Sequence, residues 1–178
     1  SPAINMGNNS EAVDPRTQMP LNVDQRGFLR FYDGAVDIGA FEVQPVITGT
    51  ITYGNATGSP TPRFVSGVLL RAVGSPNIFA TTSATGTYTL GGFGSGAYTV
   101  TPTKVGGTNG ISSFDAGLIA RHAAGIAPLT GNQLLVADTS GNGTISSFDA
   151  GQVARYAAAV PGSGSAGNWI FIPANRSY

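Results

Sequence analysis

The middle of the chain, from 46 to 103, alternates apolar and polar residues in short runs. Residues 47–53 alternate strictly, and further runs of β-branched and aromatic residues follow between glycine-rich turns. Strict alternation is typical of a half-buried strand, and short strands with regular turns favour an antiparallel sandwich. We therefore predict a small antiparallel β-sandwich over 46–103, with a loop at 55–62 and strands near 47–53, 68–73, 79–83, 87–90 and 96–102.

The pattern changes to a helical period near the end of the chain. Four apolar residues recur at i, i+3, i+4 and i+7, which marks the buried face of a helix; a Pro-Gly pair at 161–162 then stops it. Nearly the same residues occur in 110–124 and in 144–158, at an offset of 34. We therefore predict a repeated loop–helix unit over 104–161. The four residues of the helical face are Val153, Tyr156, Ala157 and Val160.

A small apolar core should hold the two predicted helices together. In the segment that joins the repeats, Leu134 and Leu135 are expected to pack between the helices. A core of this size is weak by itself, so a bound ion would add to its stability. The remaining residues expected in this core are Ile111, Ile119, Ile145, Val153 and Tyr156.

The loop 138–149 carries candidate chemistry. Oxygen-bearing side chains fall at positions 1, 3, 5, 9 and 12, and Gly143 stands at position 6, where the chain must turn sharply. A hard cation such as calcium takes six to eight oxygen ligands, and this spacing resembles the EF-hand loop, with Ser at position 3 and Asp at position 12 as departures. The predicted calcium ligands are Asp138, Ser140, Asn142, the carbonyl of Thr144, Ser146 and Asp149.

The duplicated loop–helix sequence of 104–160 resembles a dockerin domain, the calcium-binding double module of cellulosomal and related secreted proteins. Aspartate at position 12 and the lack of an entering helix are both dockerin traits. The first loop departs from the pattern because Lys104 stands where the leading aspartate belongs. Either that site is empty, with Lys104 near Asp115, or a calcium ion is held there with Lys104 turned outward, which we expect. Its ligands would be Thr108, the carbonyl of Gly110, Ser112 and Asp115.

The dockerin resemblance also implies a partner surface. Docking to a cohesin-type protein would use loop ends and helix faces that are nearly identical in both halves. The residues at these positions are Ser113, Phe114, Arg121, Ser147, Phe148 and Arg155.

Two further resemblances concern the β part of the chain. The motifs Gly86-x-Tyr88-x-Leu90 and Gly96-x-Tyr98-x-Val100 resemble transthyretin-like domains, which implies that their tyrosines and aliphatic residues form the core. The segment 1–45 resembles the last coils of secreted bacterial β-helix proteins, on the motifs Asp-Gln-Arg-Gly at 24–27 and Val-Asp-Ile-Gly-Ala-Phe-Glu at 36–42.

Within 1–45, Ile38, Phe41 and Val43 alternate as in a strand. Arg26, Asp37 and Glu42 are candidates for a catalytic cluster, but the neighbouring sequence supplies neither a nucleophile nor a histidine. We interpret them as an ion-pair network that fixes the coil.

Composition narrows the function classes. The 178 residues have zero formal net charge and only 10% charged residues, so nothing attracts nucleic acid or an anionic membrane. The chain has no cysteine, and no run is apolar enough for a membrane span. The calcium loop favours an extracellular or cell-surface setting. Because residue 1 is Ser, we expect a piece of a longer precursor.

Catalysis has little support in the sequence. His122 is the only histidine, and it falls on a predicted helix without a partner nucleophile. Asp115 and Asp149 end repeated loops, which makes them metal ligands rather than a glycosidase pair. We therefore expect a protein that is not an enzyme.

The predicted architecture is mainly β, with four parts. A β-helix-like end spans 1–45, the sandwich spans 46–103, and the dockerin-like pair spans 104–161. The last part, 162–178, is a flexible spacer followed by a strand at 168–173. Two unsatisfied β segments at opposite ends suggest that copies of the chain, or adjoining domains of a longer one, complete each other by strand addition. The sequence thus predicts a calcium-stabilised extracellular structural or adhesion protein, and possible filament subunit; the alternative is a module that docks a secreted protein onto a cohesin-type partner.

Overall fold

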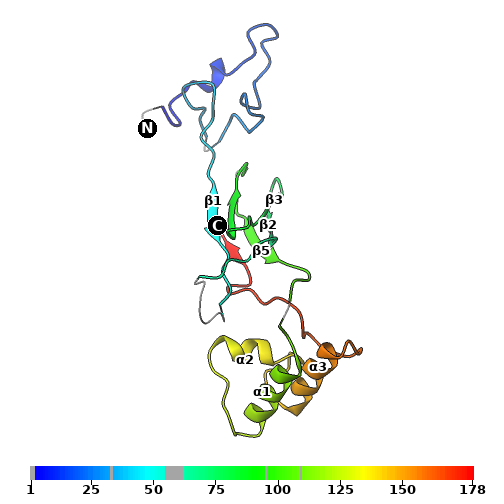
Figure 1. Ribbon diagram of the computed structural model, residues 1–178. Coiled ribbons are helices and arrows are strands. Elements are labelled where there is room, and N and C mark those ends of the chain that lie inside the picture. The colour runs from blue at the N-terminus through cyan, green and yellow to red at the C-terminus, as the bar shows by residue number, and fades with distance from the viewer. Residues whose placement is uncertain (1–2, 33, 55–61, 95, 109) are drawn as a thin grey trace. The chain divides into compact units, whose positions relative to one another are not determined.

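The computed structural model of the protein describes residues 3–32, 34–54, 62–94, 96–108 and 110–178. In these residues the chain is mainly β, with six strands in two antiparallel sheets, three short α-helices and one short 3-10 helix (Figure 1). The predicted β class is confirmed. The predicted loop at 55–62 lies almost wholly outside the described residues. The chain divides into a β unit (1–51, 64–102 and 175–178) and a helical unit (52–63 and 103–174).

The β unit holds both sheets. One sheet pairs β1 with β4 in antiparallel register, Ile47 opposite Leu90. The other has the order β3–β2–β5–β6, so the last strand of the chain lies at a sheet edge beside β5. Five of the six strands fall within or next to the runs that alternate in sequence. Their bounds are β1 Ile47–Thr50, β2 Leu69–Val73, β3 Ile78–Thr81, β4 Thr87–Leu90, β5 Thr99–Thr103 and β6 Arg176–Ser177.

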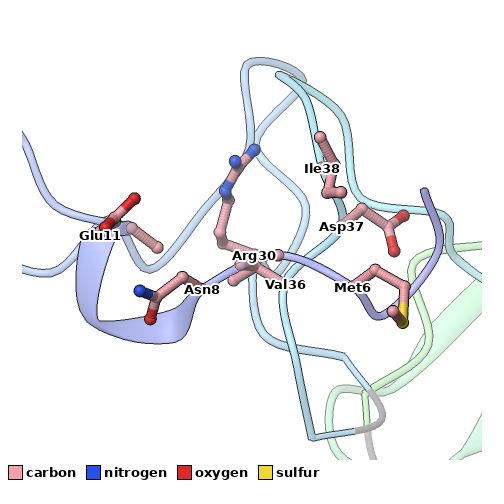
Figure 2. A pocket seen from close by; sticks show the side chains of 9 residues that line it. Met6, Asn8, Glu11, Arg30, Val36, Asp37 and Ile38 are labelled. Carbon is pink, nitrogen blue, oxygen red and sulfur yellow. The ribbon is translucent and has the colours of Figure 1, made fainter.

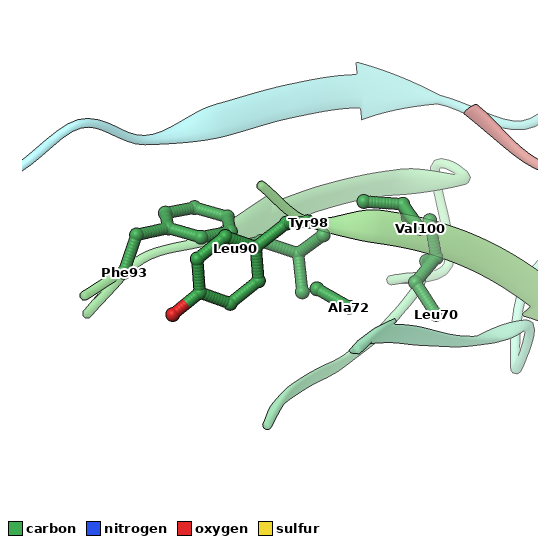
Figure 3. Close-up of a cluster of buried hydrophobic side chains, with 6 residues drawn as sticks. All are labelled: Leu70, Ala72, Leu90, Phe93, Tyr98 and Val100. Carbon is green, nitrogen blue, oxygen red and sulfur yellow. The ribbon is translucent and has the colours of Figure 1, made fainter. Parts of the chain in front are cut away.

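A compact apolar cluster forms the core of the β unit (Figure 3). Tyr98 meets Phe93 edge to face, with ring centroids 4.8 Å apart. Its hydroxyl accepts a 2.8 Å hydrogen bond from the Gly94 amide, so this buried polar atom is satisfied. Each large side chain buried in this way contributes about 1.5–3 kcal/mol. The buried members are Leu70, Ala72, Leu90, Phe93, Tyr98 and Val100, and the predicted core residue Tyr88 packs against them half-buried.

The N-terminal segment differs from the prediction. Its described residues form a short 3-10 helix, Asn9–Glu11, and three isolated bridges. The strand expected around Ile38 to Val43 is absent there: Ile38, Phe41 and Val43 are all exposed, and no ladder includes them. Several backbone amides in this segment, including those of Asn5, Glu42 and Val43, bond to buried carboxylates.

Three buried carboxylates organise that segment. Asp24 accepts hydrogen bonds from the Arg26 guanidinium and from the Glu42 amide. Burial works to raise the pKa of Asp24, but these hydrogen bonds and those from the amides of Arg26 and Phe28 outweigh it and hold the pKa well below its usual range. Glu42 accepts from the Asp37 amide at 2.9 Å.

The expected ion-pair network is therefore mostly a set of carboxylates bonded to amides. One ion pair, Asp24 with Arg26, is present among the described residues. Asp37 completes the set, because its carboxylate accepts from the Asn5 amide at 2.7 Å and from the Val43 amide at 2.6 Å.

The helical unit contains α1 (Ser113–Ala123), α2 (Asn132–Ala137) and α3 (Ser147–Ala157). α1 and α3 pack on each other, and α2 is a short helix that the sequence pattern did not predict. Leu134 and Leu135 lie on α2 and are exposed, so their expected place between the helices was wrong; Ala137 takes it. The buried core is Ala116, Ile119, Ala137, Ala150 and Val153, with Ile111 and Ile145 packed against it.

The C-terminal segment also corrects two expectations. The predicted strand at 168–173 is not formed; the final strand is β6, further along the chain. The predicted spacer at 162–167 forms a turn whose Ser165 amide and hydroxyl both donate to the Thr139 carbonyl, at 2.9 and 3.0 Å. Among the described residues, no helix is long and apolar enough to cross a membrane.

Candidate metal centre

Asp138 follows α2 directly and opens the loop 138–149. Its two carboxylate oxygens accept hydrogen bonds from the residues that follow, which bends the loop around them. Gly141 and Gly143 turn with φ of +73° and +81°, a conformation that glycine adopts at little cost. The donors to Asp138 are the Gly141 amide (2.8 Å), the Ser140 hydroxyl (3.1 Å), the Asn142 amide (3.2 Å) and the Gly143 amide (2.7 Å).

Asp149 closes the loop and is fully buried. It also belongs to the cap of α3: its Oδ2 accepts from the amide and hydroxyl of Ser146, both at 2.9 Å, while the Ser146 hydroxyl accepts from the Phe148 amide. Burial alone raises the pKa of Asp149, but the hydrogen bonds from Ser140 and Ser146 outweigh it and lower the pKa to about 2. Asp149 is therefore a carboxylate at neutral pH.

The two carboxylates converge on Ser140. Its hydroxyl donates to Asp138 at 3.1 Å and its amide donates to Asp149 at 2.9 Å. No lysine or arginine forms an ion pair with either carboxylate in the part of the chain that the structure describes. Two neighbouring negative charges without a paired cation fit a bound metal ion, and the oxygen-only donor set suits a hard one.

The remaining predicted ligands lie in the same loop. Asn142 and Thr144 are exposed, and the Asn142 side-chain oxygen accepts the Thr144 amide at 2.8 Å. Ser146 is half-buried next to Asp149. Across the described residues, no three His, Cys, Asp or Glu side chains gather as a metal site. The loop instead offers two carboxylates together with hydroxyl, amide and carbonyl oxygens.

The first loop shares the helix cap but lacks the leading carboxylate. Ser112 caps α1 as Ser146 caps α3, and Asp115 accepts the Ser112 amide and hydroxyl at 2.7 and 3.0 Å. Thr108, a predicted ligand, pairs instead with the Tyr156 hydroxyl at 3.0 Å. Gly110 has φ +90°.

Lys104 lies over an aromatic ring. Its Nζ is 5.7 Å from the centre of the Trp169 ring, which is a cation–π geometry. The Trp169 Nε1 donates to the Gly106 carbonyl at 2.8 Å, and the ring meets Tyr53 edge to face. The predicted strand residue Trp169 thus anchors the C-terminal segment to the first loop. Sequence reasoning missed this contact, which joins residues 63 positions apart.

The predicted partner-binding residues lie at the surface of the helical unit. Phe114 and Phe148 are 72% and 64% exposed, a large fraction for aromatic rings. Ser113, Ser147 and Arg121 are exposed as well. Arg155 is exposed and donates to the Pro161 carbonyl at 3.3 Å. A hollow of about 380 Å³ lies nearby, lined by Ala120, Ala123, Ala124, Ile145, Ser146 and Ser147.

A second hollow, of about 350 Å³, lies in the N-terminal segment (Figure 2). Met6, Val36 and Ile38 give it apolar walls, and Glu11 and Arg30 also line it. Its lining residues include the carboxylates of Glu11 and Asp37, and neither a histidine nor a hydroxyl nucleophile is among them.

His122 has a structural contact. Its Nδ1 accepts the Leu129 amide at 2.9 Å, which fixes the chain after α1. The ring is half-buried.

Comparison of the chain with protein-family models, with curated proteins and with solved structures finds no match. The site geometry and the sequence motifs are therefore the basis for the function proposed below.

Proposed function

We propose that the protein is a non-catalytic, calcium-stabilised structural or adhesion protein of the extracellular space or cell surface. The observation that carries this proposal is the convergence of Asp138 and Asp149 on Ser140, with no lysine or arginine among the described residues paired to either carboxylate. The ion would join the end of α2 to the start of α3, and so would brace a helical unit whose core is small and rich in alanine. The resemblance to dockerins supports the choice of calcium.

Calorimetric titration with calcium tests this proposal. Because only two carboxylates contribute, we expect a dissociation constant of about 10⁻⁵ to 10⁻³ M, the range of extracellular sites. Asp138→Ala should abolish uptake by this loop. Asp14→Ala is the matched control: its half-buried carboxylate also accepts amides two and three residues on, but in the β unit. Unchanged uptake in Asp138→Ala contradicts the proposal.

The first loop is proposed as a weaker second site. The Lys104 ammonium lies over the Trp169 ring. This orientation fits a lysine that points away from a calcium ion in the first loop. The remaining donors are Asp115, Ser112 and the carbonyl of Gly110. A second calcium equivalent that disappears in Asp115→Ala supports this site, and a stoichiometry of one in the unaltered chain excludes it.

A second candidate function is docking to a cohesin-type protein. The exposure of Phe114 and Phe148 at matched positions of the two repeats favours it, because rings so exposed gain apolar burial when a partner covers them. A pull-down should then capture the partner with the unaltered chain and lose it with Phe114→Ala/Phe148→Ala. Phe79→Ala, at another exposed ring in the β unit, is the control that keeps binding. No capture by the unaltered chain excludes docking to the cohesin tested.

Self-association is part of the structural proposal. The described N-terminal segment, which we compare with the end of a β-helix, exposes many large apolar side chains that a neighbouring chain or domain would cover. Sedimentation over a concentration series should show association. A monodisperse monomer with a protease-resistant N-terminal segment refutes it. The exposed side chains are Ile4, Met6, Met19, Leu21, Val23, Phe28, Leu29, Phe31, Ile38, Phe41 and Val43.

A further inference from the structure

The edge of β5 is covered by the last residues of the chain. Tyr98 and Tyr178 exchange both backbone hydrogen bonds, each 2.9 Å long. Beyond them, Thr99 lies opposite Ser177 and Val100 opposite Arg176. The C-terminal residues thus act as a short added strand, although residues 104–174, which carry α1, α2 and α3, separate them from β5 in sequence.

This added strand is weakly held. β6 has two residues, and both side chains are exposed, as is Tyr178. Detachment would therefore cost a few backbone hydrogen bonds and little apolar burial, the profile of a segment that opens locally. When it leaves, β5 presents a row of unpaired amides and carbonyls, which is a template for another strand.

The part of the tail nearer the helical unit is fixed more firmly. Ser165 donates twice to the Thr139 carbonyl, and the Trp169 indole donates to the Gly106 carbonyl. The weakly held strand can therefore leave its own sheet while Ser165 and Trp169 keep their contacts. Residues 172–174, between Trp169 and the strand, would serve as the hinge.

We infer that the β5 edge is a strand-acceptor site, which the C-terminal strand 175–178 of a second copy of this chain occupies in exchange for the cis strand. The structure defines the occupant, because three residues of this segment, Arg176, Ser177 and Tyr178, already pair with the edge in register. This inference rests on the self-association in the proposed function and gives it a donor and an acceptor. Where each copy donates to the next, the contact is head-to-tail and extends without closing.

The pair Thr99 and Ser177 offers a direct test. Because Tyr98 and Tyr178 form the hydrogen-bonded pair, the next pair is the non-hydrogen-bonded kind, with Cα atoms about 4.5 Å apart. That spacing permits a disulfide, and the chain has no cysteine of its own. Thr99→Cys and Ser177→Cys, made in separate full-length chains and mixed, can bridge β5 to β6 only between two molecules.

The mixture is oxidised slowly at high protein concentration and its disulfide dimers are identified by mass. We expect the mixed dimer in clear excess over the proportion of random pairing. Thr48→Cys mixed with Ser177→Cys is the control, since Thr48 is exposed in β1 of the other sheet. A mixed dimer of Thr99→Cys and Ser177→Cys no more abundant than in the control overturns the inference.

The double variant Thr99→Cys/Ser177→Cys gives an independent measurement. Oxidised at low concentration, it locks the cis strand, and its association at high concentration should fall relative to its reduced form. Equal association of both forms overturns the inference. Calcium uptake by these variants should match the unaltered chain, because both positions lie in the β unit. Loss of strand exchange with calcium uptake intact therefore refutes this inference alone, whereas absent calcium uptake refutes the calcium proposal.

Discussion

Replacing Asp149 by asparagine should destabilise the helical unit much more than the same change at Asp115. Both residues occupy position 12 of their loops and cap the following helix. Asp149, however, uses both oxygens: Oδ1 accepts the Ser140 amide and Oδ2 accepts the amide and hydroxyl of Ser146. Asparagine has only one acceptor oxygen, so one partly buried amide loses its partner.

The magnitude follows from these contacts. An unsatisfied buried donor costs about 1–3 kcal/mol, and weakening of the helix cap adds about 1 kcal/mol. We therefore expect Asp149→Asn to lower the free energy of unfolding by about 2–4 kcal/mol. Asp115 is only half-buried and accepts both Ser112 donors on one oxygen, which asparagine can still supply. Asp115→Asn should cost about 0.5–1 kcal/mol.

Urea unfolding with excess chelator measures this difference without a contribution from metal binding. Trp169, the only tryptophan, lies in the helical unit and provides a fluorescence signal for it. Equal losses in the two variants would refute the argument, because they would show that the second acceptor oxygen of Asp149 contributes nothing.

Three further predictions follow from the same contacts. Because the folded-state pKa of Asp149 is lowered from 3.8 to about 2, its contribution to stability is present above pH 4 and is lost as pH falls towards 2. Acid unfolding followed by Trp169 fluorescence, compared with Asp149→Asn, measures this contribution. Chelation of calcium should increase amide exchange in 104–160 and leave exchange in β2 and β4 unchanged, whereas equal loss of protection in both units would contradict their independence. Tyr98→Phe should destabilise the β unit by about 1–3 kcal/mol, since the buried Gly94 amide loses its acceptor. Circular dichroism during thermal unfolding measures this loss, and Tyr53→Phe, at an exposed tyrosine, is the control that should change stability little.

The strands and the two main helices could be predicted because their signals are local. The alternation of apolar and polar residues predicted β4. The helical period of apolar residues, together with the repeated Ser-Ser-Phe-Asp sequence, predicted α1 and α3. The structure shows that Ser112 and Ser146, which we predicted only as calcium ligands, cap these two helices.

The missed features depend on contacts between distant residues. The strand expected near Phe41 does not form, since buried carboxylates such as Asp37 bond the amides that a ladder would use. The local sequence around Trp169 predicts a strand, but its indole donates a hydrogen bond to the Gly106 carbonyl, which is distant in sequence. β6 is two residues long and mostly polar, and only the edge beside β5 makes it a strand.

The matching caps at Ser112 and Ser146 bear on how this module can be re-engineered. Each helix begins with a complete set of cap hydrogen bonds that uses no ion. The loop positions ahead of the cap residues can therefore change without loss of the cap hydrogen bonds. Lys104→Asp would return the leading carboxylate to a loop whose helix start is already built. The first repeat is thus a ready scaffold on which metal affinity can be graded one residue at a time.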